Sequence, residues 1–117
     1  MRESILKTKS FNFAIETISL YKELKDQNEY VLSKQLLRSG TAIGALVREA
    51  QNAESTKDFI HKLGIAQKEC DEIIYWLELL KETEYINNKE FESINNEANE
   101  LLKMIRSAII TSKKNNL

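Results

Sequence analysis

A single apolar stripe between residues 59 and 80 constrains the fold of this chain more than any other feature of its sequence. Alternating steps of four and three residues place successive side chains on one side of an α-helix. The members of the stripe are Phe59, Leu63, Ala66, Cys70, Ile73, Leu77 and Leu80. Because so long a stripe has to be covered by other helices, the sequence predicts a helical bundle.

Three other segments have the same helical period. In the first, predicted over residues 10–25 with Ser10 as its N-cap, the apolar face consists of Phe11, Ala14, Ile18 and Tyr21, with Ile15 and Leu24 on its flank. Before Ser10, Ile5 and Leu6 either extend this helix or lie across the end of the bundle. The remaining helices are predicted over 30–53, 56–82 and 88–110. The absence of proline and the presence of only three glycines favour a few long helices. Short connections make neighbouring helices antiparallel, so we predict an all-α, single-domain, up-down-up-down four-helix bundle.

The third and fourth predicted helices each begin with a capping signal. Ser55 can accept a hydrogen bond from the backbone N–H of Asp58, and Asn87 stands in the same relation to Glu90. Asp58 also lies where the helix dipole favours a negative charge. The sequence therefore predicts helix starts directly after Ser55 and Asn87.

Small residues gather in the middle of the second predicted helix. Each glycine inside a helix costs about 1 kcal/mol relative to alanine, so two glycines one turn apart require a reason. Close approach of another helix is that reason, and the helix can belong to the same chain or to a second subunit. The residues concerned are Ser39, Gly40, Ile43 and Gly44, together with Gly64 in the third predicted helix.

Composition and charge limit the class of protein. Hydrophobic residues make up 42% and charged residues 30% of the 117 residues, which is the balance of a globular domain. No apolar run approaches the roughly 18 residues of a membrane span. The first residues lack the apolar segment of a signal peptide, so we expect a cytoplasmic protein without membrane contact. A net charge of −1 gives no general electrostatic case for binding nucleic acid.

Residues that carry chemistry in other bundles are scarce in this chain. Di-metal sites in four-helix bundles need two Glu-x-x-His pairs, whereas the one histidine here, His61, follows Asp58 by three residues. Cys70 lies within the apolar stripe, where a thiol behaves as a small apolar group. Neither a phosphate-binding loop nor a nucleophile motif occurs. We expect no catalytic residue, no cofactor and no metal, and a protein that is not an enzyme.

Five basic residues are candidates for contacts with nucleic acid. A local phosphate-binding patch could form on the second predicted helix or near the end of the fourth. The competing interpretation is an ordinary solvated surface, since so few charges would release few counterions. The candidates are Lys34, Arg38, Arg48, Lys103 and Arg106.

Three stretches together resemble one bacterial family, and the likeness covers nearly the whole chain. The stretches are SGTAIGALVREA over 39–50, KDFI over 57–60 and KECDEIIYWLELL over 68–80. The family is known as the four helix bundle proteins, the 23S ribosomal RNA intervening-sequence proteins or the S23 ribosomal proteins. Two positions depart from its pattern, because many members have proline in place of Gly44 and asparagine in place of Leu46.

The resemblance implies a left-handed four-helix bundle that assembles into a homopentamer. Genes of this family lie inside intervening sequences of ribosomal RNA, a location that does not in itself show RNA binding. Two hypotheses follow. The first is a non-enzymatic, homo-oligomeric scaffold or interaction module. The second is an RNA-associated binding protein, similar to the pentameric accessory protein of diversity-generating retroelements, which engages nucleic acid.

Overall fold

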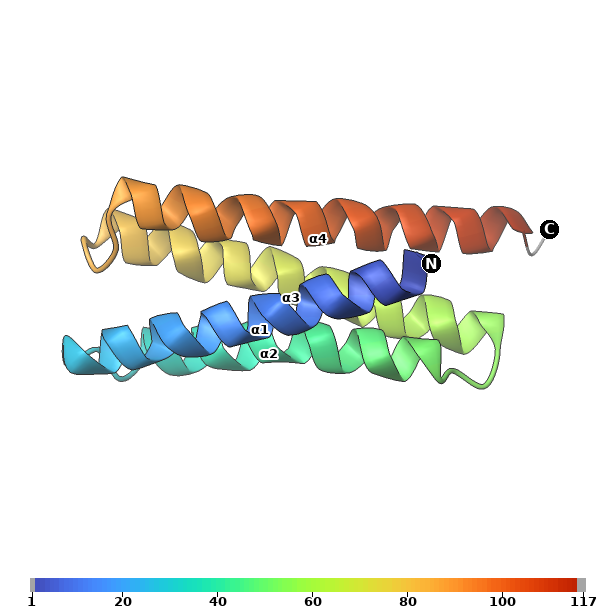
Figure 1. Ribbon diagram of the computed structural model, residues 1–117, viewed down its shortest axis with the longest axis horizontal. Coiled ribbons are helices and arrows are strands. Elements are labelled where there is room, and N and C mark those ends of the chain that lie inside the picture. Colours follow the sequence, from blue (N-terminus) through green and yellow to red (C-terminus); the bar gives the residue numbers. More distant parts are fainter. Residues whose placement is uncertain (1, 116–117) are drawn as a thin grey trace.

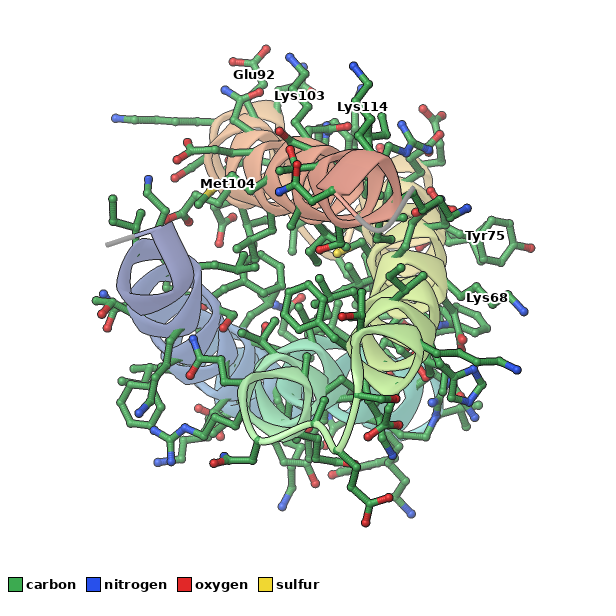
Figure 2. The ribbon with its side chains drawn as sticks, turned by 90° about the vertical axis from the view of Figure 1, so that its right-hand side faces the viewer. Lys68, Tyr75, Glu92, Lys103, Met104 and Lys114 are labelled. Carbon is green, nitrogen blue, oxygen red and sulfur yellow. The ribbon has the colours of Figure 1, made fainter. Side chains whose placement is uncertain are left out.

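The structure, a computed structural model, describes residues 2–115 and the side chains of residues 5–115. This part of the chain contains no strand and forms four helices, which are α1 (Arg2–Asp26), α2 (Leu32–Gln51), α3 (Thr56–Glu82) and α4 (Asn88–Asn115). Successive helices reverse direction within a body of 49 × 21 × 21 Å (Figure 1). Each helix packs against the next, and α4 also contacts α1, so that α1 lies diagonally across from α3 (Figure 2). The all-α fold predicted from the sequence is confirmed.

The apolar stripe of α3 lies at the centre of the core. From Leu63 to Leu80 its six members are buried, and Phe59 is packed against them at the end of the bundle. The other three helices also contribute core residues that are at most 2% exposed, among them Phe13 and Leu24 of α1, Leu36, Ile43 and Val47 of α2, and Leu101 and Ile105 of α4. Burial of a continuous stripe from each helix is the main source of stability in such a bundle.

Helices α3 and α4 begin at the predicted capping residues. Ser55 Oγ accepts a hydrogen bond from the backbone N–H of Asp58 at 3.0 Å. At the start of α4 the capping box is complete, because Asn87 Oδ1 accepts from the Glu90 N–H at 2.8 Å and Glu90 Oε1 accepts from the Asn87 N–H at 3.2 Å. These bonds satisfy backbone donors that a helix start otherwise leaves unpaired.

Helix α2 is shorter than predicted, and Glu29 accounts for its start. The buried Glu29 carboxylate accepts from the backbone N–H groups of Val31, Leu32 and Ser33, the last at 2.6 Å. Burial alone would raise the pKa of Glu29, but these hydrogen bonds to the ionised form outweigh it and lower the pKa below its usual range. The Glu29 side chain thus caps a helix that begins at Leu32, two residues later than the predicted start at residue 30.

Helix α1 differs most from expectation. It begins at Arg2, and Ser10 is no N-cap, since the residue lies inside the helix and its hydroxyl donates to the Lys7 carbonyl oxygen at 3.1 Å. The prediction that α4 ends near residue 110 was also wrong, because the helix continues to Asn115.

The apolar face assigned to the first helix turns outward instead of inward. The buried side of α1 consists of Leu6, Ser10, Phe13, Thr17, Leu20 and Leu24. Ser10 and Thr17 make this side look polar in the sequence, yet their hydroxyl groups bond to backbone carbonyl oxygens of their own helix. With apolar residues on both sides, periodicity could not tell which side meets the bundle.

Candidate functional site

The small residues of α2 pack against α1. A Cβ added to Gly40 would overlap the Thr17 side chain and lie 2.8 Å from Ile73 Cδ1. A Cβ added to Gly44 would lie 3.2 Å from the Ser10 carbonyl oxygen. Ser39 and Ile43, predicted with these glycines, are buried in the bundle. Within the chain, the neighbouring helix thus accounts for both glycines of α2.

The outward side of α1 presents an apolar strip, which we call the outer face of α1. It consists of Phe11, Ala14, Ile15, Ile18 and Tyr21, which recur at steps that keep them on one side of the helix. Phe11 is 50%, Ile15 51% and Ile18 37% exposed. Scattered apolar residues are normal on a protein surface, but a contiguous strip on one helix marks an interaction surface.

Basic side chains border the outer face of α1. The guanidinium of Arg48, on α2, lies 5.3 Å from the centre of the Phe11 ring. The Lys25 ammonium lies 5.3 Å from the centre of the Tyr21 ring, and Lys22 is exposed one turn beyond Ile18. These cation–π contacts place the two charged groups over the Tyr21 and Phe11 rings, while Ile15 and Ile18 between the rings stay exposed.

A polar network joins α2 to α3 on another side of the bundle. Arg38 forms ion pairs with Glu69, at 3.2 Å, and with Glu72. Glu72 also accepts a hydrogen bond from Trp76 Nε1 at 3.2 Å. The hydrogen bond to Glu72 raises the pKa of Arg38, and the same bond lowers the pKa of Glu72. Arg38 is therefore engaged within the chain.

The five candidate nucleic-acid contacts do not meet in one patch. Lys34, Arg38 and Arg48 lie on α2, whereas Lys103 and Arg106 lie on α4. These two helices are diagonal neighbours in the bundle, and Figure 2 shows Lys103 pointing away from the side occupied by α2. With Arg38 paired to carboxylates, each of the two sides has only two of the candidates.

Helices α1 and α4 touch least of the neighbouring pairs, and a cavity of about 430 Å³ opens between their ends. Apolar side chains from all four helices line it, including Leu6, Val47, Phe59 and Met104. Lys103 stands among its polar lining residues. The cavity has the size of a small-molecule site, but the described residues that line it include no acid, histidine or cysteine for catalysis.

Farther along the same seam, Glu97 of α4 faces Glu16 of α1. Burial raises the pKa of Glu97 to about 7, and the adjacent Glu16 and Glu100 carboxylates act in the same direction. Glu97 Oε2 is buried without a hydrogen-bond partner among the described residues. Lys9, paired with Glu100 nearby, opposes the rise only in part. In the sequence, the only sign of this group is that Glu97 stands next to Ala98, on the apolar side of α4.

The two residues considered for chemistry lie apart from any such site. Cys70 is buried, and burial raises its thiol pKa to about 12, so the thiolate is absent at neutral pH. His61 is exposed near the start of α3. Among the described residues, no cluster of three or more histidine, cysteine or acidic side chains could hold a metal ion. Nor does any helix in this part of the chain combine the length and apolar character that crossing a membrane requires.

Fold and surface together define the class: an all-α bundle of four long helices whose first helix presents an apolar outer face. This chain belongs to the 23S rRNA-intervening sequence protein family, whose model matches residues 2–107. The family membership predicted from the sequence motifs is confirmed.

One solved structure supports both the fold and the family. It is a protein of unknown function from the S23 ribosomal protein family of Bacteroides thetaiotaomicron, and it is 53% identical to this chain, with a TM-score of 0.91. The match covers 93% of this chain and 98% of the other. No curated protein is significantly similar in sequence. The comparisons thus give fold and family, and no activity.

Proposed function

We propose that this protein is a non-enzymatic, cytoplasmic scaffold or interaction module that works as a homo-oligomer, and that the oligomer is the homopentamer implied by its family. The observation that supports the proposal is the outer face of α1, where three large apolar side chains are between 37% and 51% exposed. Burying such a strip in a subunit contact would remove apolar surface from water.

The surface that supports self-association lies on α1 and not on α2. In the sequence, the glycines of α2 were candidates for a subunit contact, but Gly40 and Gly44 already have neighbours within the chain. On the outer face of α1, by contrast, Phe11, Ile15 and Ile18 remain between 37% and 51% exposed. The proposal that the protein is not an enzyme draws on the buried, protonated thiol of Cys70.

The absolute mass in solution, measured by light scattering, tests the proposal. Five copies of the 13.6 kDa chain correspond to about 68 kDa, that is, five times 13.6 kDa. A mass near this value is the expected result. A mass of one chain at micromolar concentration would contradict the proposed homo-oligomer.

A matched pair of substitutions locates the contact. Ile15, on α1, is 51% exposed, and Ile110, on α4, is 54% exposed. We expect Ile15→Arg to lower the mass to that of smaller species, because it places a charge in the apolar contact, and Ile110→Arg to leave the mass unchanged. Equal effects of the two substitutions would exclude the outer face of α1 as the contact.

The alternative, RNA binding resembling that of the retroelement accessory protein, has weaker support in this chain. The candidate cations are divided between α2 and α4, and Arg38 is held by two carboxylates. If RNA is nevertheless the partner, binding to a structured RNA must weaken steeply as salt rises. Absence of binding at low salt would exclude this alternative.

A further inference from the structure

A second exposed face lies across the bundle, on α3. We call it the outer face of α3, and it runs along one side of the helix through the half-buried Ile60 and Gly64 and the exposed Asp71, Tyr75, Glu78 and Glu82. Tyr75 is 55% exposed, and Figure 2 shows it pointing away from the bundle. A Cβ added to Gly64 would meet no atom of the described chain within 4 Å. Unlike the glycines of α2, Gly64 therefore has no packing reason within the chain.

The two outer faces differ in the sign of their charges. The outer face of α1 is bordered by the exposed basic residues Lys22, Lys25 and Arg48, against the exposed acid Asp26 at the end of the helix, so that basic groups prevail. The last three turns of the outer face of α3 present the three exposed carboxylates of Asp71, Glu78 and Glu82 around Tyr75. Each face thus combines an apolar centre with charges that complement those of the other, which is the arrangement that favours one docking partner over others.

The charges also lie at matching heights along the bundle. Gly40 of α2 approaches both Thr17 of α1 and Ile73 of α3, so Thr17 and Ile73 lie at about the same level. Helices α1 and α3 run in the same direction (Figure 1), and each rises about 1.5 Å per residue. Lys22 lies five residues beyond Thr17, and Glu78 lies five residues beyond Ile73.

Two further pairs fall at similar heights by the same count. Lys25 follows Thr17 by eight residues, and Glu82 follows Ile73 by nine. Ile18 is one residue beyond Thr17, close to the level of Tyr75, two residues beyond Ile73. A rotation of one copy about an axis parallel to the bundle preserves these heights. It therefore brings lysines opposite glutamates and an apolar side chain opposite Tyr75.

We propose that the outer face of α1 in one copy docks against the outer face of α3 in the next copy, in a parallel, head-to-tail contact. This inference rests on the proposed homo-oligomer and specifies which surfaces meet in it. The two faces lie on diagonally placed helices, so each copy can use both at once. In a pair of subunits, one copy still has a free outer face of α1 and the other a free outer face of α3. Repeating the contact forms a ring that uses both faces of every subunit when each copy is turned by one fifth of a circle relative to the last, as the proposed homopentamer requires, and an open row of subunits when the rotation does not close.

A two-fold contact between two copies of the outer face of α1 is the main competitor. That contact would gather Lys22, Arg48 and their symmetry mates around one apolar patch, and it would leave the acidic face of α3 without a partner. Basic residues also occur on α3, but Lys81 is half-buried against α4, 4.8 Å from the centre of the Phe91 ring, whereas Lys25 and Arg48 are exposed, and Lys68 precedes the acidic turns. The head-to-tail contact is therefore favoured.

Charge reversal tests the proposal. One variant combines Lys22→Glu with Lys25→Glu, a second combines Glu78→Lys with Glu82→Lys, and a third carries all four substitutions. The control combines Lys103→Glu with Lys114→Glu. Figure 2 shows both of these lysines on the outside of α4. We expect each two-residue variant to fall from the wild-type mass to that of one 13.6 kDa chain, the third variant to recover the wild-type mass, and the control to retain it.

The outcomes separate this inference from the proposed function. A monomeric wild type would overturn both. An oligomeric wild type whose mass survives the Glu78→Lys and Glu82→Lys reversal would overturn the head-to-tail contact and leave self-association standing. Failure of the third variant to recover the mass, with helical circular dichroism intact, would likewise overturn the pairing of these charges.

Cysteine cross-linking provides a second measurement that does not depend on charge. Ile18→Cys and Tyr75→Cys in the same chain place one thiol on each outer face, and the native Cys70 is buried and cannot compete. We expect oxidation to produce covalent multimers that end at the ring size. Dimers formed by the Ile18→Cys chain alone would instead support the two-fold contact and contradict the proposal.

Discussion

Gly40 determines how closely α1 and α2 approach each other. Its missing Cβ leaves room for Thr17, a stiff β-branched residue whose hydroxyl donates to the Phe13 carbonyl oxygen at 2.9 Å. We expect Gly40→Ala to lower the free energy of unfolding by about 2 kcal/mol, because overpacking outweighs the better helix propensity of alanine. Urea denaturation measures the change.

The Thr17→Ala background controls for this effect. It removes both atoms of Thr17 that the new Cβ would overlap, so we expect the cost of Gly40→Ala to fall well below its value in the native chain. The difference between the two costs is the coupling energy of the pair. Equal costs in the two backgrounds would show that contact with Thr17 is not the reason for the glycine.

Glu97 makes stability depend on pH. Its pKa is raised to about 7 in the folded chain, so between its unfolded and folded pKa values the folded state binds more protons. The free energy of unfolding must then decrease as pH rises through this range. At pH 8 we expect Glu97→Gln to raise the free energy of unfolding by about 1 to 2 kcal/mol, allowing for partial solvent screening. At pH 4 we expect the substitution to change the free energy of unfolding little.

Denaturation at several pH values measures the effect of Glu97→Gln, with Glu92→Gln as the control on the same helix. Figure 2 shows Glu92 pointing away from the bundle, and the residue is exposed. The control should leave the pH dependence as it is in the native chain. If Glu97→Gln leaves it unchanged as well, Glu97 is not the group responsible.

At the scale of the elements, capping residues set the helix boundaries. Asn87 and Glu90 exchange two hydrogen bonds at the start of α4. We expect Asn87→Ala to lower the free energy of unfolding by about 1 kcal/mol, since it leaves a backbone N–H at the helix start without this partner. Asn96→Ala, at an exposed position inside α4, should have no such cost, because alanine is the better helix former there. A similar loss for both variants would argue against a capping role.

At the scale of the whole molecule, the proposed oligomer links stability to concentration. Anything that binds only the folded state stabilises it by mass action, and a second copy of the chain is such a ligand. We expect the Tm of the native chain to fall on dilution and the Tm of Ile15→Arg to be independent of concentration. Calorimetry over a hundredfold range of concentration measures this. A Tm of the native chain that does not change on dilution would contradict stabilisation by self-association.

The sequence by itself determined the features that depend on neighbouring residues. The bounds of α3, the caps at Ser55 and Asn87 and the burial of the stripe from Leu63 to Leu80 follow from helical spacing and local hydrogen bonds. The family also followed from contiguous motifs. Each of these features is encoded within a few turns of one helix, where spacing alone specifies which side chains meet.

Tertiary structure alone decided which side of α1 meets the bundle, because both of its sides carry apolar residues. Burial of Thr17 depends on Gly40, which lies on another helix. The raised pKa of Glu97 likewise depends on burial in the seam between α1 and α4 and on Glu16 across that seam. The reason is physical: orientation and electrostatic environment are set by contacts between segments distant in sequence, and no local pattern specifies which of two apolar faces finds a partner.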